Sequence, residues 1–256
     1  QITLGMGDMG TIKVCVSECG NNKKYKWDQS AYTSMSDTGL SEGITYPTSG
    51  SSYATLQYFT PELPFGTTAH IEFGQQSKAG QSGNASNTTN GNSMEGYGLV
   101  TKPVDGLTLS AYYMSVNDYD DGTTSEQQLE EGGAYALKYS AGNITVGYGK
   151  SLHAPEITTV VTTGALAAEA EYYENTGMSI GFAVNDDLSV SYTREESERN
   201  LANSGTIQYD IEMDSIQVAY SLGGATLSLA RAEYENAGFA QNADVSETII
   251  AMSFAF

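Results

Sequence analysis

The sequence predicts an all-β protein, a transmembrane antiparallel β-barrel with about thirteen strands in this chain out of sixteen in the complete protein. Three observations predict this fold. Bulky apolar residues alternate with small or polar ones along most of the chain. The second face of these segments carries few of the charges that a water-facing surface needs. Short and long connections alternate from one end of the chain to the other.

The alternation has a period of two, which is the repeat of a β-strand. In "MSIGFAV" (178–184), the residues Met, Ile, Phe and Val alternate with Ser, Gly and Ala. The same pattern recurs in residues 52–59, 68–75, 134–140, 143–149, 188–192, 215–222 and 247–256. We therefore expect each of these segments to be a strand with one strongly apolar face.

The other face is mostly Gly, Ala, Ser and Thr, which suits neither a dry core nor a charged exterior. Charged residues make up 16% of the chain, against about 25% in ordinary soluble proteins. In a membrane barrel, apolar residues face lipid while small and polar residues face a wet lumen. The pattern covers residues 1–256, so a single transmembrane barrel domain is expected.

The charge balance is 11 basic against 31 acidic residues, a formal net charge of −20. This balance excludes a general nucleic-acid binder, which needs a basic surface. No apolar run reaches the ~18 residues of a transmembrane helix. No signal peptide precedes the first predicted strand at Gln1, so the chain is expected to be a processed or truncated product.

The connections indicate a slab that is crossed by hairpins. Short links at 5–10, 60–66, 102–106, 140–143, 185–187 and 223–224 alternate with long links at 17–50, 76–93, 117–131, 151–173, 195–212 and 235–244. Tight turns on one side and large loops on the other are typical of outer-membrane barrels. The long links hold much of the acid, so we expect an acidic outer rim.

Three motifs, in this order along the chain, resemble the general porins of Gram-negative bacteria. "GDMGTIKV" (7–14) is similar to the Gly-Asp-Phe-Gly turn of that family and the strand after it. "GITYPTSGSSYATLQYFTPELPFG" (43–66) resembles the segment that leaves the constriction loop, and "SFAF" (253–256) resembles the terminal strand. Counting back from a sixteenth strand at Phe256 makes residues 2–5 the fourth strand, so about three N-terminal strands are expected to be missing from this chain.

The resemblance implies a water-filled channel for passive diffusion of small hydrophilic solutes and ions, which is not an enzyme and has no cofactor. It implies a homotrimer set among outer-membrane lipid and lipopolysaccharide, with a terminal Phe256 that the barrel assembly machinery reads. The link 17–50 corresponds to the third loop, which folds inward and narrows the pore. Two alternatives stay open: a substrate-specific channel of more strands, and a secreted β-sandwich adhesin or surface-layer protein with a dry core.

Charges on the link 17–50 are the candidates for the pore constriction, because charges at a constriction set the field that selects ions. They are Lys23, Lys24, Lys26, Asp28, Asp37 and Glu42, and for each the competing interpretation is an ordinary loop charge. By strand parity, the lumen-facing candidates are Lys13, His70, Glu72 and Lys138. The net charge and the acidic loops predict a weak preference for cations. Where porins commonly carry Gly-Arg, this chain has Cys15-Val16, which weakens the family's basic ladder at that position.

Enzymatic and metal sites are not favoured. The two histidines, His70 and His153, are too few for a His-based triad or a zinc site, and a lipase dyad of His70 with Glu72 is less favoured than a pair of lumen residues. The acidic group Asp118, Asp120 and Asp121 lacks the spacing of an EF-hand. Adventitious calcium is the most that we expect there.

Two pairs of residues do not follow the strand pattern simply. Cys15 and Cys19 are expected to be bystanders, because their Cα atoms would lie roughly 13 Å apart in an extended strand, too far for a disulfide. A local disulfide and a metal site are the alternatives. Arg194 and Arg231 fall on the apolar parity of their strands. Either they lie above the bilayer or a bulge turns them inward.

Overall fold

The computed structural model describes residues 1–15, 27–33, 42–47, 54–75, 93–117, 128–155, 170–201 and 207–254. Within these ranges, 13 strands form one sheet in sequence order, each pairing antiparallel with its neighbours. The strands are β1 (Ile2–Gly5), β2 (Thr11–Cys15), β3 (Ala54–Phe59), β4 (Thr68–Gln75), β5 (Ser93–Thr101), β6 (Leu107–Asn117), β7 (Glu131–Ala141), β8 (Ile144–Ala154), β9 (Ala170–Ala183), β10 (Leu188–Leu201), β11 (Ile211–Leu222), β12 (Ala225–Glu235) and β13 (Val245–Phe254). The predicted all-β fold and the strand count are confirmed.

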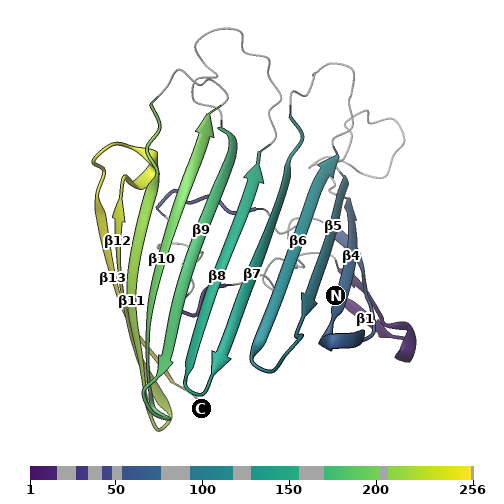
Figure 1. Ribbon diagram of the computed structural model, residues 1–256, viewed down its shortest axis with the longest axis horizontal. Coiled ribbons are helices and arrows are strands. Elements are labelled where there is room, and N and C mark those ends of the chain that lie inside the picture. Colours follow the sequence, from purple (N-terminus) through teal and green to yellow (C-terminus); the bar gives the residue numbers. More distant parts are fainter. Residues whose placement is uncertain are drawn as a thin grey trace.

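The sheet is strongly curved, and tight turns lie along its lower edge (Figure 1). Short 3₁₀ turns stand in three described connections: η1 (Gly7–Met9), η3 (Pro64–Gly66) and η5 (Ala237–Phe239). Two-residue turns follow β7 and β11, beginning at Gly142 and Gly223, whose φ angles are 58° and 61°. Tight hairpins favour such left-handed residues because their twist matches that of the strands. No helix among the described residues is long and apolar enough to cross a membrane.

The two faces of the sheet have inverted polarity. Large apolar side chains lie exposed on the outer face: Phe254 is 59%, Tyr220 39% and Phe182 37% exposed. The inner face buries polar side chains instead, including Gln57 at 0% and Gln217 at 1% exposure. A dry-core sandwich would bury the first three side chains together. The parity that the sequence predicts, with bulky residues outward, is therefore confirmed.

Small apolar clusters do occur on the inner face, towards the ends of the strands that carry the longer connections. One consists of Ile44, Ile211, Met213, Ala232, Tyr234, Ala237 and Phe239. The other consists of Met94, Tyr112, Met114 and Val116 on β5 and β6. The first joins β11, β12 and η5 to a segment of the link between β2 and β3, so it helps to position that segment.

The sheet is open within the described residues. The edge strands are β1, which pairs with β2 alone, and β13, which pairs with β12 alone. All other described strands have two partners.

Three sequence-based expectations are corrected or decided. The link predicted at 195–212 is shorter, because β10 continues to Leu201 with polar rather than apolar alternation. Cys15, the last residue of β2, is disulfide-bonded, so it is not a bystander; Cys19 lies outside the described residues. Arg194 and Arg231 point outward, since the strand pairings show no register shift at either residue.

Candidate functional site

Two segments of the link between β2 and β3 lie on the inner face of the sheet, far from the strands that they connect. Residues 27–33 and 42–47 run along β8–β12, and dark blue segments of this link pass behind β9 and β10 in Figure 1. We call residues 27–33 the outgoing arm and residues 42–47 the returning arm. Each contacts side chains that are more than 100 residues away in the sequence.

The outgoing arm is bound to the wall through its backbone. Four of its N–H groups donate hydrogen bonds to side-chain oxygens of the inner face. These bonds run from Gln29 N to Ser179 Oγ (3.1 Å), from Ala31 N to Ser191 Oγ (2.8 Å), and from Tyr32 N and Thr33 N to Gln217 Oε1 (3.1 and 2.9 Å). Gln217 Nε2 in turn donates to Thr33 O at 3.0 Å. The small polar inner face therefore acts as a set of anchors for this arm.

Asp28, one of the predicted constriction residues, is the residue of the outgoing arm whose carboxylate lies next to these anchors. Its Oδ1 accepts hydrogen bonds from Ser30 N at 2.9 Å and Ser30 Oγ at 2.6 Å. Thr193 Oγ1 and Ser179 Oγ lie at 3.3 and 3.5 Å from the same oxygen. The carboxylate thus lies at the junction of the arm and the wall.

The returning arm is held by an apolar contact and by polar bonds. Ile44 is 6% exposed within the inner apolar cluster. Gly238 N donates to Glu42 O at 2.9 Å, which ties the arm to η5. Asn175 Nδ2 donates to Thr45 O at 2.8 Å. The predicted constriction residue Glu42 is therefore fixed through its backbone at the last connection of the sheet.

Tyr46 of the returning arm is partly buried and pairs with the buried Glu195 of β10. The Tyr46 hydroxyl donates to Glu195 Oε2 at 2.7 Å, and Glu195 is 1% exposed. Glu195 Oε1 has no hydrogen-bond partner among the described residues. Burial, and then the neighbouring Glu195 carboxyl, raise the pKa of the Tyr46 phenol well above its ordinary value. Sequence reasoning placed Glu195 in a loop, because residues 193–199 are all polar and show no apolar alternation.

The predicted lumen residues share the inner face but differ in burial. His70, 4% exposed, stacks between Phe59 and Tyr112, with ring centroids 5.4 and 6.1 Å away. Glu72 is also 4% exposed and accepts a hydrogen bond from the Tyr112 hydroxyl at 2.9 Å.

The two lysines of this set are partly exposed. Lys13 lies on β2 opposite Gln57, and Lys138 lies on β7 opposite Gly147. Whether they face water in a lumen stays a prediction.

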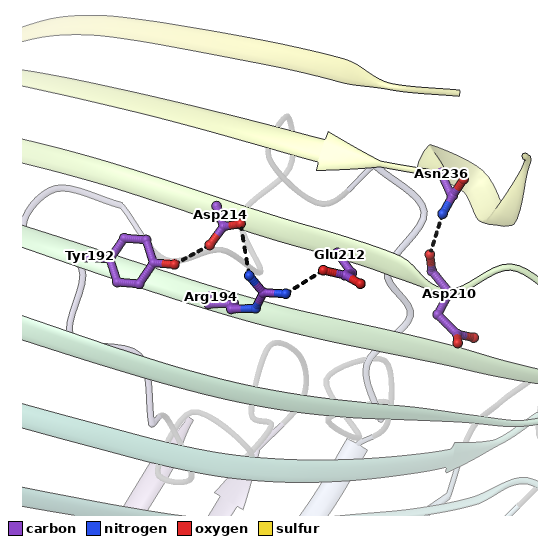
Figure 2. Close-up of polar contacts among 6 residues, drawn as sticks. All are labelled: Tyr192, Arg194, Asp210, Glu212, Asp214 and Asn236. Carbon is purple, nitrogen blue, oxygen red and sulfur yellow. Dashed lines mark hydrogen bonds and ion pairs between the residues drawn. The ribbon is translucent and has the colours of Figure 1, made fainter. Parts of the chain in front are cut away.

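A polar belt on the outer face was not foreseen from the sequence. In Figure 2, Arg194 lies between Glu212 and Asp214 of the neighbouring strand, and the Tyr192 hydroxyl points to Asp214. The same figure shows Asn236 Nδ2 donating to Asp210 O, at 3.1 Å, at the end of the wall. The belt continues on other strands as Tyr97–Glu95 (3.0 Å), Tyr113–Glu131 (2.8 Å), Lys150–Glu174 (2.6 Å) and Arg231–Glu233 (3.0 Å). The pairs lie in the parts of their strands nearer the longer connections, although on β8 the exposed, apolar Leu152 follows Lys150.

Several candidate residues lie outside the described ranges. They are Lys23, Lys24, Lys26 and Asp37 of the constriction set, together with Cys19, Asp118, Asp120, Asp121 and the terminal Phe256. Their roles stay predictions. Within the described ranges, no three His, Cys, Asp or Glu side chains are grouped so that they could hold a metal ion.

The chain is similar to solved outer-membrane proteins. No family model matches it, and no curated protein sequence matches it. It resembles a porin refined at 1.8 Å resolution, with a TM-score of 0.67 and 16% identity, covering 98% of this chain and 79% of that one. It also resembles OmpT, an outer membrane protein of Vibrio cholerae in a trimer form, with a TM-score of 0.58 and 12% identity, covering 96% and 75%. The chain therefore has the porin-like, outer-membrane β-barrel fold.

Proposed function

We propose that this chain forms the wall and the constricting loop of a bacterial outer-membrane channel that admits small hydrophilic solutes and ions by passive diffusion. The observation that carries the proposal is the inward loop: both arms lie along a polar inner face, while the apolar side chains point outward. On this proposal, the loop on the inner face narrows the lumen. Such a channel selects by size and by the charges along its path, and it needs neither a catalytic residue nor a cofactor.

The charges on the inner face support a weak preference for cations. Besides the buried Glu195, the acidic groups on this face among the described residues are Asp28, Glu42, Glu72 and Glu247, and the basic groups are Lys13, Lys138 and Arg199. The whole chain carries a net charge of −20. Acidic walls raise the local concentration of cations and lower that of anions.

The two open edges support a larger barrel. In hydrocarbon, every unpaired backbone group costs several kcal/mol, so sheets that span a membrane are closed. Here β1 and β13 each lack a second partner within the described residues. We expect about three further strands to join them and to complete a barrel of sixteen.

The proposed setting is the outer membrane, where lipid and lipopolysaccharide would contact the apolar band and the polar belt. A homotrimer is supported by the trimer form of the Vibrio cholerae protein with this fold. The alternating, apolar last strand supports recognition by the barrel assembly machinery through Phe256.

The experiment is conductance through a planar lipid bilayer, using the mature protein purified in detergent from outer membranes. In KCl we expect stepwise increases in current and, in a KCl gradient, a reversal potential that favours K⁺. In liposomes that contain the protein, we expect the rate of sugar or amino-acid uptake not to saturate with solute concentration. Folded protein that never conducts would overturn the channel. Anion preference would overturn the selectivity alone, and saturation by one solute would favour a substrate-specific channel.

A further inference from the structure

Three glycines make a flat patch on the inner face where the outgoing arm begins. Gly149 of β8 and Gly177 of β9 are directly opposite each other in the strand pairing. Gly147 lies two residues away on β8, on the same face. We call these residues the glycine trough. Because none of them has a side chain, the wall has no relief across two neighbouring strands at this point.

The chain's single tryptophan, Trp27, fills the space that side chains would take. A Cβ atom built on Gly177 would lie 2.6 Å from Trp27 Cε2, and closer still to Cζ2 and Cη2. One built on Gly149 would lie 2.8 Å from Trp27 Cβ and closer to the indole ring. One built on Gly147 would lie 2.8 Å from the carbonyl carbon of Trp27. Carbon atoms in contact are about 3.5–4.0 Å apart, so even alanine would displace Trp27 by about 1 Å.

Glycine inside a strand weakens the sheet, and it often marks a close approach by another part of the chain. The trough fits that rule on two adjacent strands at once, whereas Gly5, on β1, has no atom within 4 Å of its virtual Cβ. The hydrogen bonds to Ser179, Ser191 and Gln217 end on side chains that can follow a small shift of the arm. The contact of the indole with the bare backbone is rigid by comparison.

From this geometry we infer that the glycine trough is a specificity determinant of the channel: by seating Trp27 it sets how far the inward loop stands from the wall, and so the largest solute that passes. The inference deepens the proposed channel function and rests on it. Residues of the wall under the loop, and not only residues that face the solute, then determine the width of the channel.

The test is the double variant Gly149→Ala/Gly177→Ala, with Gly5→Ala as the matched control for a strand glycine. Fluorescence of Trp27 in detergent reports the seat without any need for conduction. We expect a red-shifted emission and stronger quenching by acrylamide in the double variant. In bilayers, we expect a lower single-channel conductance in KCl and a smaller exclusion limit for polyethylene glycols than in the control.

A cycle with Trp27→Ala separates this role from a general weakening of the barrel. Without the indole, the added methyl groups have nothing to displace, so conductance should not fall further when both glycines are replaced. An equal fall with and without Trp27 would overturn the inference, as would a shifted emission with unchanged or raised conductance. If the double variant does not fold, Gly181→Ala replaces it, because its Cβ would lie 3.0 Å from Gln29 O and so displaces the same arm more gently.

The two proposals fail in different ways. A wild-type protein that never conducts overturns the channel and leaves the trough testable through fluorescence. If the wild-type protein conducts, but the double variant has the same emission and conductance as Gly5→Ala, only the inference about the glycine trough is overturned.

Discussion

Tyr46 shows how single contacts hold the inward loop at the residue scale. Its hydroxyl is the hydrogen-bond donor to the buried Glu195 carboxyl, whose second oxygen has no described partner. An unmet hydrogen bond on a buried polar group is more costly than a bond is beneficial. A phenol and a carboxyl from distant parts of the chain are thus dependent on each other.

We expect Tyr46→Phe to lower the free energy of unfolding by about 1–3 kcal/mol, because it leaves the Glu195 carboxyl buried without that bond. Urea titration in detergent, followed by gel migration without heating, measures this loss. The control is Tyr220→Phe on the outer face, where the side chain is 39% exposed, and its loss of unfolding free energy should be much smaller. Equal losses in the two variants would show that the buried bond is not important.

The same residue predicts a dependence on pH. Because burial raises the pKa of Tyr46 in the folded protein, its stabilising contribution is fully present below the unfolded phenol pKa of about 10. It is lost as the pH rises towards the folded value. Wild-type protein should therefore lose more stability than Tyr46→Phe between neutral pH and strongly alkaline pH. Parallel alkaline unfolding curves would contradict this.

Arg194 gives a prediction for the outer face. It is shared by Glu212 and Asp214, so Arg194→Ala leaves two neighbouring carboxylates without their cation. We expect a loss of about 1 kcal/mol, the upper end for exposed ion pairs, and more where lipid replaces water. A double-mutant cycle with Asp214→Ala measures the coupling. Additive losses would mean that the ion pair contributes nothing to stability. Arg231→Ala, which removes the exposed ion pair with Glu233, is the comparison for the loss in Arg194→Ala.

At the scale of the strand, side-chain parity is the property that sequence determines best. A strand has only two faces, so the period-two pattern of residues 144–148 or 178–182 fixes which residues face outward. The pattern fails at the strand ends, where both faces become polar. On β10 the outward residues Arg194, Glu196 and Glu198 alternate with the inward residues Glu195, Ser197 and Arg199. A rule based on apolar alternation therefore ends β10 too early.

Parity can be tested with one pair of neighbouring substitutions. Val146 points outward and Thr145 inward on β8. Val146→Lys should destabilise the protein by about 2–4 kcal/mol if it reaches the bilayer midplane. Thr145→Lys should cost much less, because an inward lysine remains hydrated. Unfolding in lipid vesicles compares the two variants. Equal costs would contradict a lipid-facing outer surface and a wet interior.

The outgoing arm can be loosened from one wall residue. Gln217 makes three hydrogen bonds to Tyr32 and Thr33, each contributing roughly 0.5–1.5 kcal/mol. In Gln217→Ala we expect faster amide exchange at Tyr32 and Thr33, with the strands unaffected. Ser228→Ala, on the inner face of β12, is the control. Unchanged exchange would show that the arm is held by other contacts.

At the scale of the whole molecule, the sequence predicted the wall far better than the loop. Residues in neighbouring strands meet through a repeating pattern, so the wall follows from local alternation. The seat of the loop depends on pairs such as Gln29 with Ser179, which are 150 positions apart, and a single sequence carries no signal for such pairs. The sequence does show glycine at positions 147, 149 and 177, but a glycine in a strand has several possible causes and does not by itself predict a contact with the loop. The inverted polarity of the two faces was predictable because it involves every strand.

The disulfide at Cys15 also indicates in which compartment the chain is oxidised. Cytosolic thiols are kept reduced, whereas the bacterial periplasm oxidises them. The chain's only other cysteine, Cys19, follows four positions later in the sequence. The mature protein should resist alkylation until a reductant is added, whereas precursor retained in the cytosol should react at once. The oxidation state of Cys15 would therefore distinguish exported protein from protein still in the cytosol.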